Sequence, residues 1–188
     1  MGLYQKIRDT WNEQTPEFLE VHRKRLTQWR AEPVTIRIDF PTRLDRARAL
    51  GYKAKQGFII VRQRVIRGGH TRPDIKGGRR TKHARQRKIV AKSYQQIAEE
   101  RAQRSFTNCT VLNSYFVGKD GMHDWYEVIL IDRAHPNIAK DHQLRNLGRG
   151  RTFRGITSAG RKSRGLRNKG LGAEKMRPSH RAKGRKAN

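Results

Sequence analysis

The 188-residue sequence has little of the material from which most folded proteins build a core. It contains one cysteine, Cys109, which excludes an internal disulfide framework and a cysteine-rich zinc site. We expect this cysteine to be a buried and unreactive thiol. Hydrophobic residues make up 34% of the chain and aromatic residues 7%. These are too few to cover 188 positions with packed structure, so the composition favours a modest folded domain with appendages.

Long apolar segments are also missing. No run approaches the roughly 20 residues that span a bilayer. The N-terminal stretch MGLYQKIRDTWNEQTPEF has no hydrophobic segment and includes Asp9, Glu13 and Glu17, unlike a secretory signal or a typical transit peptide. Lys6 stands where a myristoylation signal has Ser or Thr. We therefore expect a cytoplasmic protein in a reducing compartment, with no membrane partner.

Acidic residues are scarce as well: 16 Asp and Glu stand against 44 Lys and Arg, for a formal net charge of +28. Residues 67–92 have a net charge of +9 and residues 148–188 one of +13, so these two segments hold 22 of the 28 net charges. A field of this strength indicates a polyanionic partner. We expect a body over residues 1–147 with an inserted basic loop at 67–92, followed by a basic tail rich in glycine and arginine at 148–188.

Capping residues and turns divide the body into helices and strands. Thr15 before Pro16, and Ser93, are expected to cap helices, and Thr42 with Asp45 resembles a capping box. Asp120-Gly121 between two β-rich runs predicts a hairpin. The expected elements are helices near 2–11 and 15–32, a strand at 34–38, a helix from 42 to about 51, a strand at 58–66, a helix at 94–106, strands at 109–118 and 125–132, and a helix near 136–146.

This order predicts an α+β fold. A small antiparallel or mixed sheet, β-α-β-α-β-β, would be covered by helices and would bear the long basic internal loop and the extended basic C-terminal tail. The tail has eight glycines and few core-forming residues, so we expect it to be disordered without a partner. One short helix over SAGRKSRGL, capped by Thr157 or Ser158, is the exception.

Enzyme motifs are missing. The sequence has no GxxxxGK[ST], no GxGxxG after a strand and no HExxH. GRGRTFRG at 148–155 is interpreted as flexible chain bearing arginines. His135 and His142, with Asp132 and Asp141 nearby, are interpreted as a helix edge rather than a metal site. Glu127 and Asp132 have opposite parity on one strand and cannot form a paired-carboxylate site. We expect no enzymatic activity, no small-molecule substrate and no cofactor beyond Mg²⁺ associated with RNA.

The remaining features indicate contact with RNA. Arginine pairs with phosphates through two parallel hydrogen bonds and stacks on bases, and interleaved glycines let the backbone approach a phosphate. Histidines and one aromatic side chain in these segments could stack on bases. Chosen by segment and chemistry, the candidate RNA-binding residues are Arg43, Arg46, Arg48, Lys53, Lys55, Arg67, His70, Arg72, Lys76, Arg79, Arg80, Lys82, His83, Arg85, Arg87, Lys88, Arg149, Arg151, Phe153, Arg154, Arg161, Lys162, Arg164, Arg167, Lys169, Lys175, Arg177, His180, Arg181, Lys183, Arg185 and Lys186.

Three long strings of the sequence resemble a known family: PTRLDRARALGYKAKQGFIIVRQRV, VLNSYFVGKDGMHDWYEVILIDRAHPNI and the tail from FRGITSAGRKSRGL onward. They are similar to the archaeal and eukaryotic type of ribosomal protein fifteen of the large subunit, and the ending near residue 188 resembles the archaeal members. The resemblance implies a structural protein of the large ribosomal subunit, with an antiparallel sheet flanked by helices on both faces. It also implies binding of large-subunit rRNA by the basic extensions, with neighbouring ribosomal proteins as further partners.

Three other classes share the positive charge. A chromatin-type DNA-binding protein is the main alternative, although the sequence shows neither a recognition helix nor dimer symmetry. An RNA-modifying enzyme would need a cofactor loop or a nucleophile with its base. A polybasic protein of the membrane surface would need an amphipathic helix or a lipid anchor.

Overall fold

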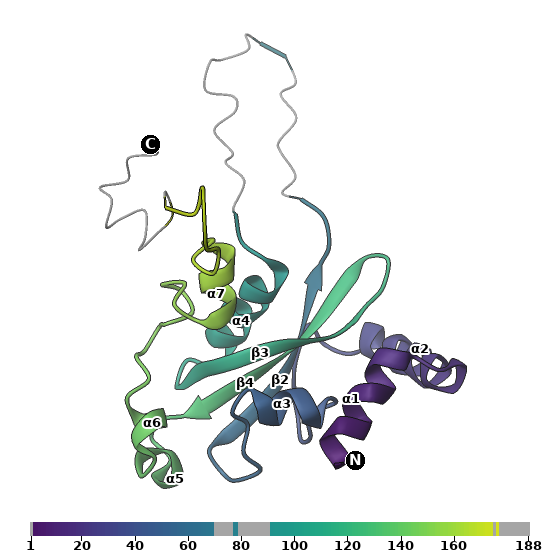
Figure 1. The fold of residues 1–188 in the computed structure, drawn as a ribbon, viewed down its shortest axis with the longest axis horizontal. Helices are drawn as coiled ribbons and strands as arrows, with labels where there is room; N and C mark the ends of the chain where they lie inside the picture. The colour runs from purple at the N-terminus through teal and green to yellow at the C-terminus, as the bar shows by residue number, and fades with distance from the viewer. Residues whose placement is uncertain (1, 70–76, 79–90, 175, 177–188) are drawn as a thin grey trace.

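The computed structural model describes residues 2–69, 77–78, 91–174 and 176. Its centre is a four-stranded antiparallel sheet in the order β1-β2-β4-β3, flanked by helices (Figure 1). The elements of the described residues are α1 (Leu3–Glu13), α2 (Pro16–Ala31), β1 (Thr35–Ile38), α3 (Leu44–Ala49), β2 (Phe58–Ile66), α4 (Tyr94–Ser105), β3 (Cys109–Lys119), β4 (His123–Asp132), α5 (Pro136–Ala139), α6 (His142–Arg145) and α7 (Ser158–Ser163). The predicted α+β class is confirmed, and of the two sheet types left open the structure has the antiparallel one.

The β3–β4 hairpin forms where Asp120-Gly121 predicted it. The Asp120 carboxylate accepts hydrogen bonds from the backbone N–H groups of Met122 (2.8 Å) and His123 (2.5 Å), which closes the turn. Strand β4 then pairs with β2 over nine residues, from Phe58 opposite Ile131 to Ile66 opposite His123. Because β4 is central, its side chains are buried on both faces of the sheet.

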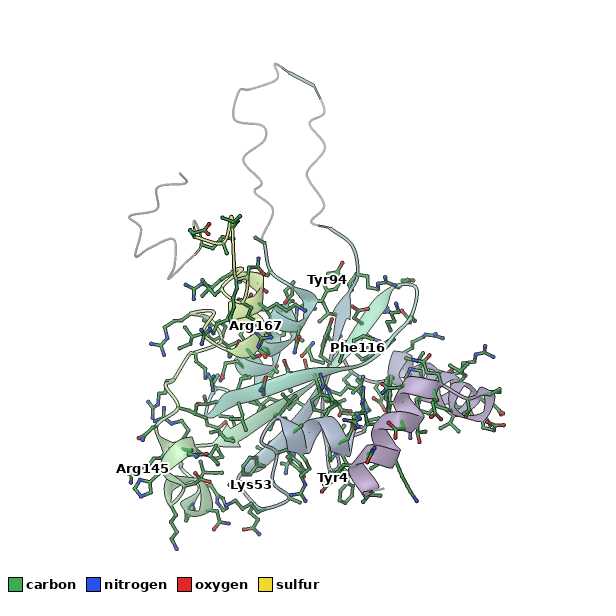
Figure 2. All side chains as sticks on the ribbon, in the orientation of Figure 1. Tyr4, Lys53, Tyr94, Phe116, Arg145 and Arg167 are labelled. Atoms are coloured by element: carbon green, nitrogen blue, oxygen red, sulfur yellow. The ribbon has the colours of Figure 1, made fainter. Side chains whose placement is uncertain are left out.

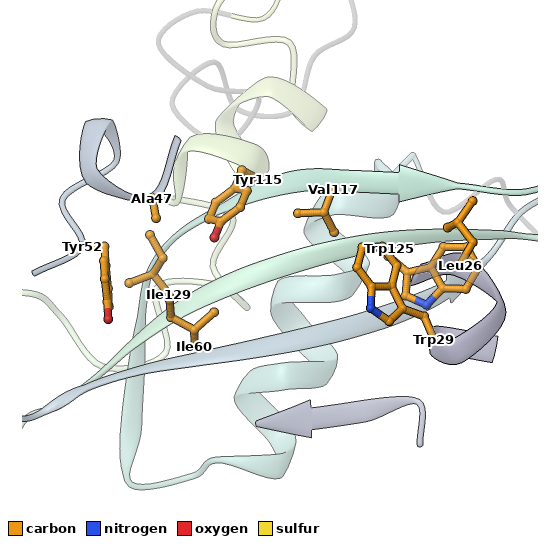
Figure 3. Close-up of a cluster of buried hydrophobic side chains, with 9 residues drawn as sticks. All are labelled: Leu26, Trp29, Ala47, Tyr52, Ile60, Tyr115, Val117, Trp125 and Ile129. Carbon is orange, nitrogen blue, oxygen red and sulfur yellow. The ribbon is translucent and has the colours of Figure 1, made fainter. Parts of the chain in front are cut away.

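The two faces of the sheet carry separate cores. On one face, Trp125 and Ile129 of β4 pack with Ile60 and with Trp29 of α2 (Figure 3). On the other face, Val128 and Leu130 pack with Val61 and with Ala98 and Ala102 of α4. This division follows from the two-residue period of a strand. Each large side chain buried in this way stabilises the fold by roughly 1.5–3 kcal/mol.

Three helix starts follow the capping predictions. The hydroxyl of Thr15 accepts from the N–H of Phe18 at 3.4 Å, and Pro16 occupies the first helical position. The hydroxyl of Ser93 accepts from the N–H of Gln96 at 3.3 Å. The hydroxyl of Thr157 accepts from the N–H of Gly160 at 3.1 Å and begins the short helix α7. These bonds satisfy backbone donors that a helix cannot satisfy itself.

The capping box predicted at Thr42 is wrong. Helix α3 begins after Arg43 and has no side-chain cap. The N–H of Thr42 instead donates to Glu127 Oε2 at 3.0 Å, and its hydroxyl donates to Glu127 Oε1. Glu127 is fully buried, and a buried carboxylate without donors would be costly. Thr42 therefore serves as a hydrogen-bond donor to Glu127, which is distant in sequence, and not as a helix cap. Gly51 follows α3 at φ +98°, close to the expected end of the helix.

The single helix expected near 136–146 is two short helices, α5 and α6. The Asp141 carboxylate accepts from the N–H of Gln143 at 3.1 Å and begins α6 anew. The ring Nδ1 of His135 accepts from the N–H of Asn137 at 3.2 Å and caps α5. His135 and Asp141 thus act as helix caps.

Candidate nucleic-acid interface

The ends of the basic loop are held together by the body. Tyr94, the first residue of α4, accepts a hydrogen bond from the N–H of Gly68 at 2.7 Å through its hydroxyl. The same hydroxyl donates to the carbonyl oxygen of Gly68 at 3.1 Å. The chain therefore leaves the sheet after β2 and returns at α4 at one place. The two ends of the basic loop are therefore held in place by β2 and α4, which both belong to the core.

Helix α7, part-way along the basic tail, lies at the same place. The N–H of Ser93 donates to the Ser163 hydroxyl of α7 at 3.0 Å, and that hydroxyl donates to the Ser93 hydroxyl at 2.9 Å. The end of β2, the start of α4 and α7 lie at the same end of the molecule (Figure 1). The basic loop and the tail, which are 70 residues apart in sequence at this contact, are therefore joined where the loop returns to the body. We call Gly68, Ser93, Tyr94 and Ser163 the anchor residues.

A buried carboxylate of α4 holds the first part of the tail. Glu99 is fully buried and accepts from the hydroxyls of Thr157 and Ser114, both at 2.6 Å. Burial raises the pKa of Glu99, while these two hydrogen bonds and the positive charge of Arg151 act in the opposite direction. Thr157 thus caps α7 and at the same time connects the tail to the core.

The early tail packs more closely than the sequence predicted. Thr152, Thr157 and Gly160 are buried, and Gly155 has φ +63°. A Cβ on Gly160 would lie 2.6 Å from the Cα of Gly155, so the two backbones are in direct contact. The expectation of flexible, unpacked chain is therefore wrong for residues 152–157, while the short helix expected from Ser158 is present as α7. Their core is built from small residues and a buried hydrogen bond rather than from large apolar side chains.

Several candidate cations of the tail are exposed around α7. Arg161, Lys162, Arg167 and Lys169 are exposed to solvent. Other arginines are used partly to fold the segment, because Arg164 donates to the carbonyl oxygen of Gly155 at 3.2 Å and Arg154 to that of Arg149 at 2.8 Å. Arg151 is partly buried near Glu99, and burial lowers the pKa of its guanidinium group.

The candidates of the body lie elsewhere. Arg43 is partly buried: it pairs with Asp45 at 3.0 Å, and its guanidinium carbon lies 4.7 Å from the ring centroid of Trp11. Arg46, Arg48 and Lys55 are exposed. Lys53 pairs with Asp141 at 3.0 Å. Lys53 lies toward the opposite end of the molecule from Tyr94 (Figure 2), so these cations do not form one continuous surface with α7.

Arg67, at the base of the loop, is held by the β3–β4 turn. It pairs with Asp124 at 3.5 Å and donates to the carbonyl oxygen of Asp120 at 2.8 Å. The other candidates of the loop and the late tail lie outside the described residues: His70, Arg72, Lys76, Arg79, Arg80, Lys82, His83, Arg85, Arg87, Lys88, Lys175, Arg177, His180, Arg181, Lys183, Arg185 and Lys186.

Sequence reasoning missed a cleft at the other end of α4. A cavity of about 550 Å³ lies between the end of α4, the start of β3, the residues after β4 and the segment 149–153. Phe153 and Arg149, both candidates, line it together with Arg104 and Arg133, which were not candidates. Nothing local marks these two arginines, because the three stretches 103–110, 133–134 and 149–153 meet only in the folded chain.

The remaining residues of chemical interest have structural roles. Cys109 is buried as predicted, and burial raises the pKa of its thiol. Tyr115 donates to the buried Glu127 at 2.5 Å. Within the described part of the chain, no three His, Cys, Asp or Glu side chains gather as metal ligands would. None of the helices described is long and apolar enough to cross a bilayer.

Comparison with known proteins decides the family. The profile of the family described as Ribosomal L15 matches residues 2–183. The chain belongs to this family. It is 52% identical to the large ribosomal subunit protein eL15 of Picrophilus torridus, over 98% of both chains. It is 50% identical to the protein of the same name from Thermoplasma volcanium, over 98% of this chain and 96% of the relative. The eL15 protein of Nanoarchaeum equitans is 52% identical, over 97% and 98%.

Membership of the Ribosomal L15 family confirms the resemblance found in the sequence. The chain is a structural ribosomal protein rather than an enzyme, and the matched relatives are archaeal. The chromatin-type alternative is not supported. The family also accounts for the division of charge, since a ribosomal protein has RNA as its natural polyanionic partner.

Proposed function

We propose that this chain is incorporated into the large ribosomal subunit by binding its rRNA with a cationic loop and a cationic tail that are joined to each other at the anchor residues. The joined anchor residues are the observation that carries the proposal, because they place the ends of loop 67–92 beside α7 of the tail. Since the loop and the part of the tail that follows α7 leave from one point, they can contact different rRNA helices and hold those helices together.

The proposed binding is electrostatic. Each Lys or Arg that pairs with a phosphate releases condensed counterions, so many such contacts sum to strong, salt-sensitive binding. Contacts of this kind recognise the shape and backbone of RNA more than its sequence. The exposed residues Arg161, Lys162, Arg167 and Lys169 supply such contacts at the base. The candidates outside the described residues would supply most of the remainder.

The body has the role of a platform in this proposal. Its 121 residues outside the two basic segments have a net charge of only +6, so they can fold around an ordinary core without strong self-repulsion. Neighbouring ribosomal proteins are the second class of partner that we propose, through surfaces of this body. The division into a body at 1–147 and an RNA-binding tail from 148 stays part of the proposal.

The experiment is a competition for incorporation in cells. A tagged chain lacking residues 177–188, which removes five Lys and Arg, competes with the untagged full chain for large subunits. We expect reduced incorporation, while circular dichroism and thermal unfolding of the purified variant stay unchanged. The matched control replaces five exposed cations of the body by Gln: Lys6, Arg23, Lys24, Lys119 and Lys140.

The two variants separate charge in the tail from charge in general. We expect the control to enter subunits at the level of the full chain. Equal incorporation of the truncated chain and the full chain would show that the late tail is not needed, and would contradict the proposal.

A further inference from the structure

The cleft lined by Arg104, Arg133, Arg149 and Phe153 has the composition of a nucleotide site. We propose that it binds one unstacked nucleotide of an RNA strand, with the base on Phe153 and the flanking phosphates on the three arginines. This inference rests on the proposed function, since it names what the chain would hold at one particular place. It places RNA contact at the other end of α4 from the anchor residues.

Size and charge suit a nucleotide. The cavity of about 550 Å³ falls in the range of roughly 300–1,000 Å³ that is typical of small-ligand sites. Its lining includes three arginines and neither aspartate nor glutamate, and of the three Arg104 also pairs with Glu100 of α4 at 3.8 Å. Arg149 makes no side-chain hydrogen bond or ion pair within the described part of the chain, and it is exposed. Its charge is therefore available to a phosphate.

Phe153 offers a surface for stacking. Its side chain remains 50% exposed although it belongs to a packed segment of the tail. The guanidinium carbon of Arg104 lies 5.7 Å from the ring centroid, so one contact already orients the ring. An exposed aromatic ring beside arginines is the usual platform for a base that has left its stack. A duplex presents only its backbone to such a cleft and would leave the ring unused.

The wall of the cleft is rigid, which lowers the cost of binding. The buried Gln103 donates to the carbonyl oxygens of Phe106 (3.0 Å) and Cys109 (2.7 Å) and accepts from the N–H of Val111 at 3.2 Å. Gln103 thereby fastens the end of α4 to the start of β3. Arg133 is held from the other side, where it donates to the carbonyl oxygen of Arg145 at 3.4 Å. In a preformed site, little binding free energy is lost in ordering the side chains that contact the ligand.

The test measures how the full chain binds the trinucleotide UUU and the same trinucleotide without its central base. We expect the complete probe to bind more tightly. Phe153→Ala should weaken binding of the complete probe by roughly tenfold and leave the abasic probe unchanged, because only the base stacks. Arg149→Ala should weaken both probes and flatten the dependence of affinity on salt, because this variant pairs with fewer phosphates. Phe153→Trp, which keeps an aromatic ring, should retain the preference for the complete probe that Phe153→Ala loses.

Two control variants test whether the effects are specific to the cleft. Phe40→Ala removes an exposed phenylalanine outside the cleft, and Arg23→Ala removes an exposed arginine of α2. Neither control should change the preference for the base. A thiouridine in the centre of UUU should crosslink to the peptide that contains Phe153, and this link should disappear in Phe153→Ala.

The outcomes separate this inference from the proposed function. If the chain binds structured RNA in a salt-dependent way but Phe153→Ala and Phe40→Ala give the same preference between the probes, the nucleotide site is refuted and the proposed function stands. If neither structured RNA nor UUU binds, both fail. Equal affinity for uridine monophosphate and UUU would identify a free nucleotide as the occupant and overturn the assignment to an RNA strand.

Discussion

Two buried glutamates, one on each face of the sheet, show how individual residues join distant parts of the chain, and one of them, Glu99, holds the cationic tail to the body. Glu127 gathers donors from Thr42 and Tyr115, and Glu99 gathers them from Ser114 and Thr157. Burial raises the pKa of both carboxyls, and in each case the hydrogen bonds that they accept oppose the rise. The two residues connect segments that are far apart in sequence, so each should have a measurable effect on stability.

The first prediction concerns the pH dependence that Glu99 causes. Because its folded-state pKa is raised, the folded state holds this proton more tightly than the unfolded state does. Its contribution to stability is therefore greatest below the ordinary glutamate pKa of about 4.3 and declines as the pH rises towards the folded-state value. Denaturant unfolding at several pH values, with Glu99→Gln beside the natural chain, measures this effect.

The difference in unfolding free energy between the two proteins should change with pH in one direction. The unfolding free energy of the natural chain, taken relative to Glu99→Gln, should decrease as the pH rises through this window, while Glu127 contributes equally to both proteins. A difference that stays constant with pH would show that burial of Glu99 does not perturb its titration.

The second prediction concerns the contact between Gly155 and Gly160. Gly160→Ala places a Cβ 2.6 Å from backbone atoms that cannot rotate away, so α7 must shift. Overpacking of this kind costs about 1–3 kcal/mol. Thermal unfolding should show the resulting destabilisation. Gly121→Ala is the matched control, because its Cβ would meet nothing within 4 Å, and it should leave the unfolding temperature nearly unchanged.

At the scale of elements, the base of the basic loop depends on one side chain of α4. Tyr94→Phe removes both hydrogen bonds to Gly68 and should cost about 1 kcal/mol. The third prediction is that amide hydrogen exchange at residues 66–69 becomes faster, while exchange in β4 remains slow. Unchanged exchange at residues 66–69 would show that Tyr94 does not hold the base. Tyr4→Phe, on α1, serves as the control.

Sequence predicted the elements well where the signal is local. The caps at Thr15, Ser93 and Thr157 and the turn at Asp120 depend on residues two or three positions away, and the structure has all four. It failed where a distant partner decides, as for Thr42, whose hydroxyl is taken by Glu127. Local patterns in a sequence carry no information about a contact across 85 residues.

From the sequence we predicted which segments contain the candidate site, but not how those segments are arranged in space. Charge density indicated the loop and the tail, but it did not show that the end of the loop meets α7 through Ser93 and Ser163. The packed early tail was missed because small residues such as Gly160 carry no hydrophobic signal. Arg104 and Arg133 were missed because their surroundings are ordinary in sequence, and only the fold brings them to Phe153.

At the scale of the whole molecule, the charge should determine how affinity depends on salt. Removal of residues 177–188 takes away five Lys and Arg. The fourth prediction is that the slope of log affinity against log salt, measured with structured rRNA fragments, falls by roughly 0.7–0.9 for each phosphate that is no longer neutralised, or about four units if all five cations contribute. The control with five neutralised body cations should keep the slope of the full chain.

The central claim is that RNA is held by the two cationic segments, which the anchor residues join. Ultraviolet crosslinking of intact large subunits, followed by mass spectrometry of the nucleotide-linked peptides, tests this most directly. We predict that the linked peptides fall mainly within residues 67–92 and 148–188, and that the nucleotides linked to the two segments belong to different rRNA helices. Crosslinks confined to α1 and α2, with none from either segment, would contradict the claim.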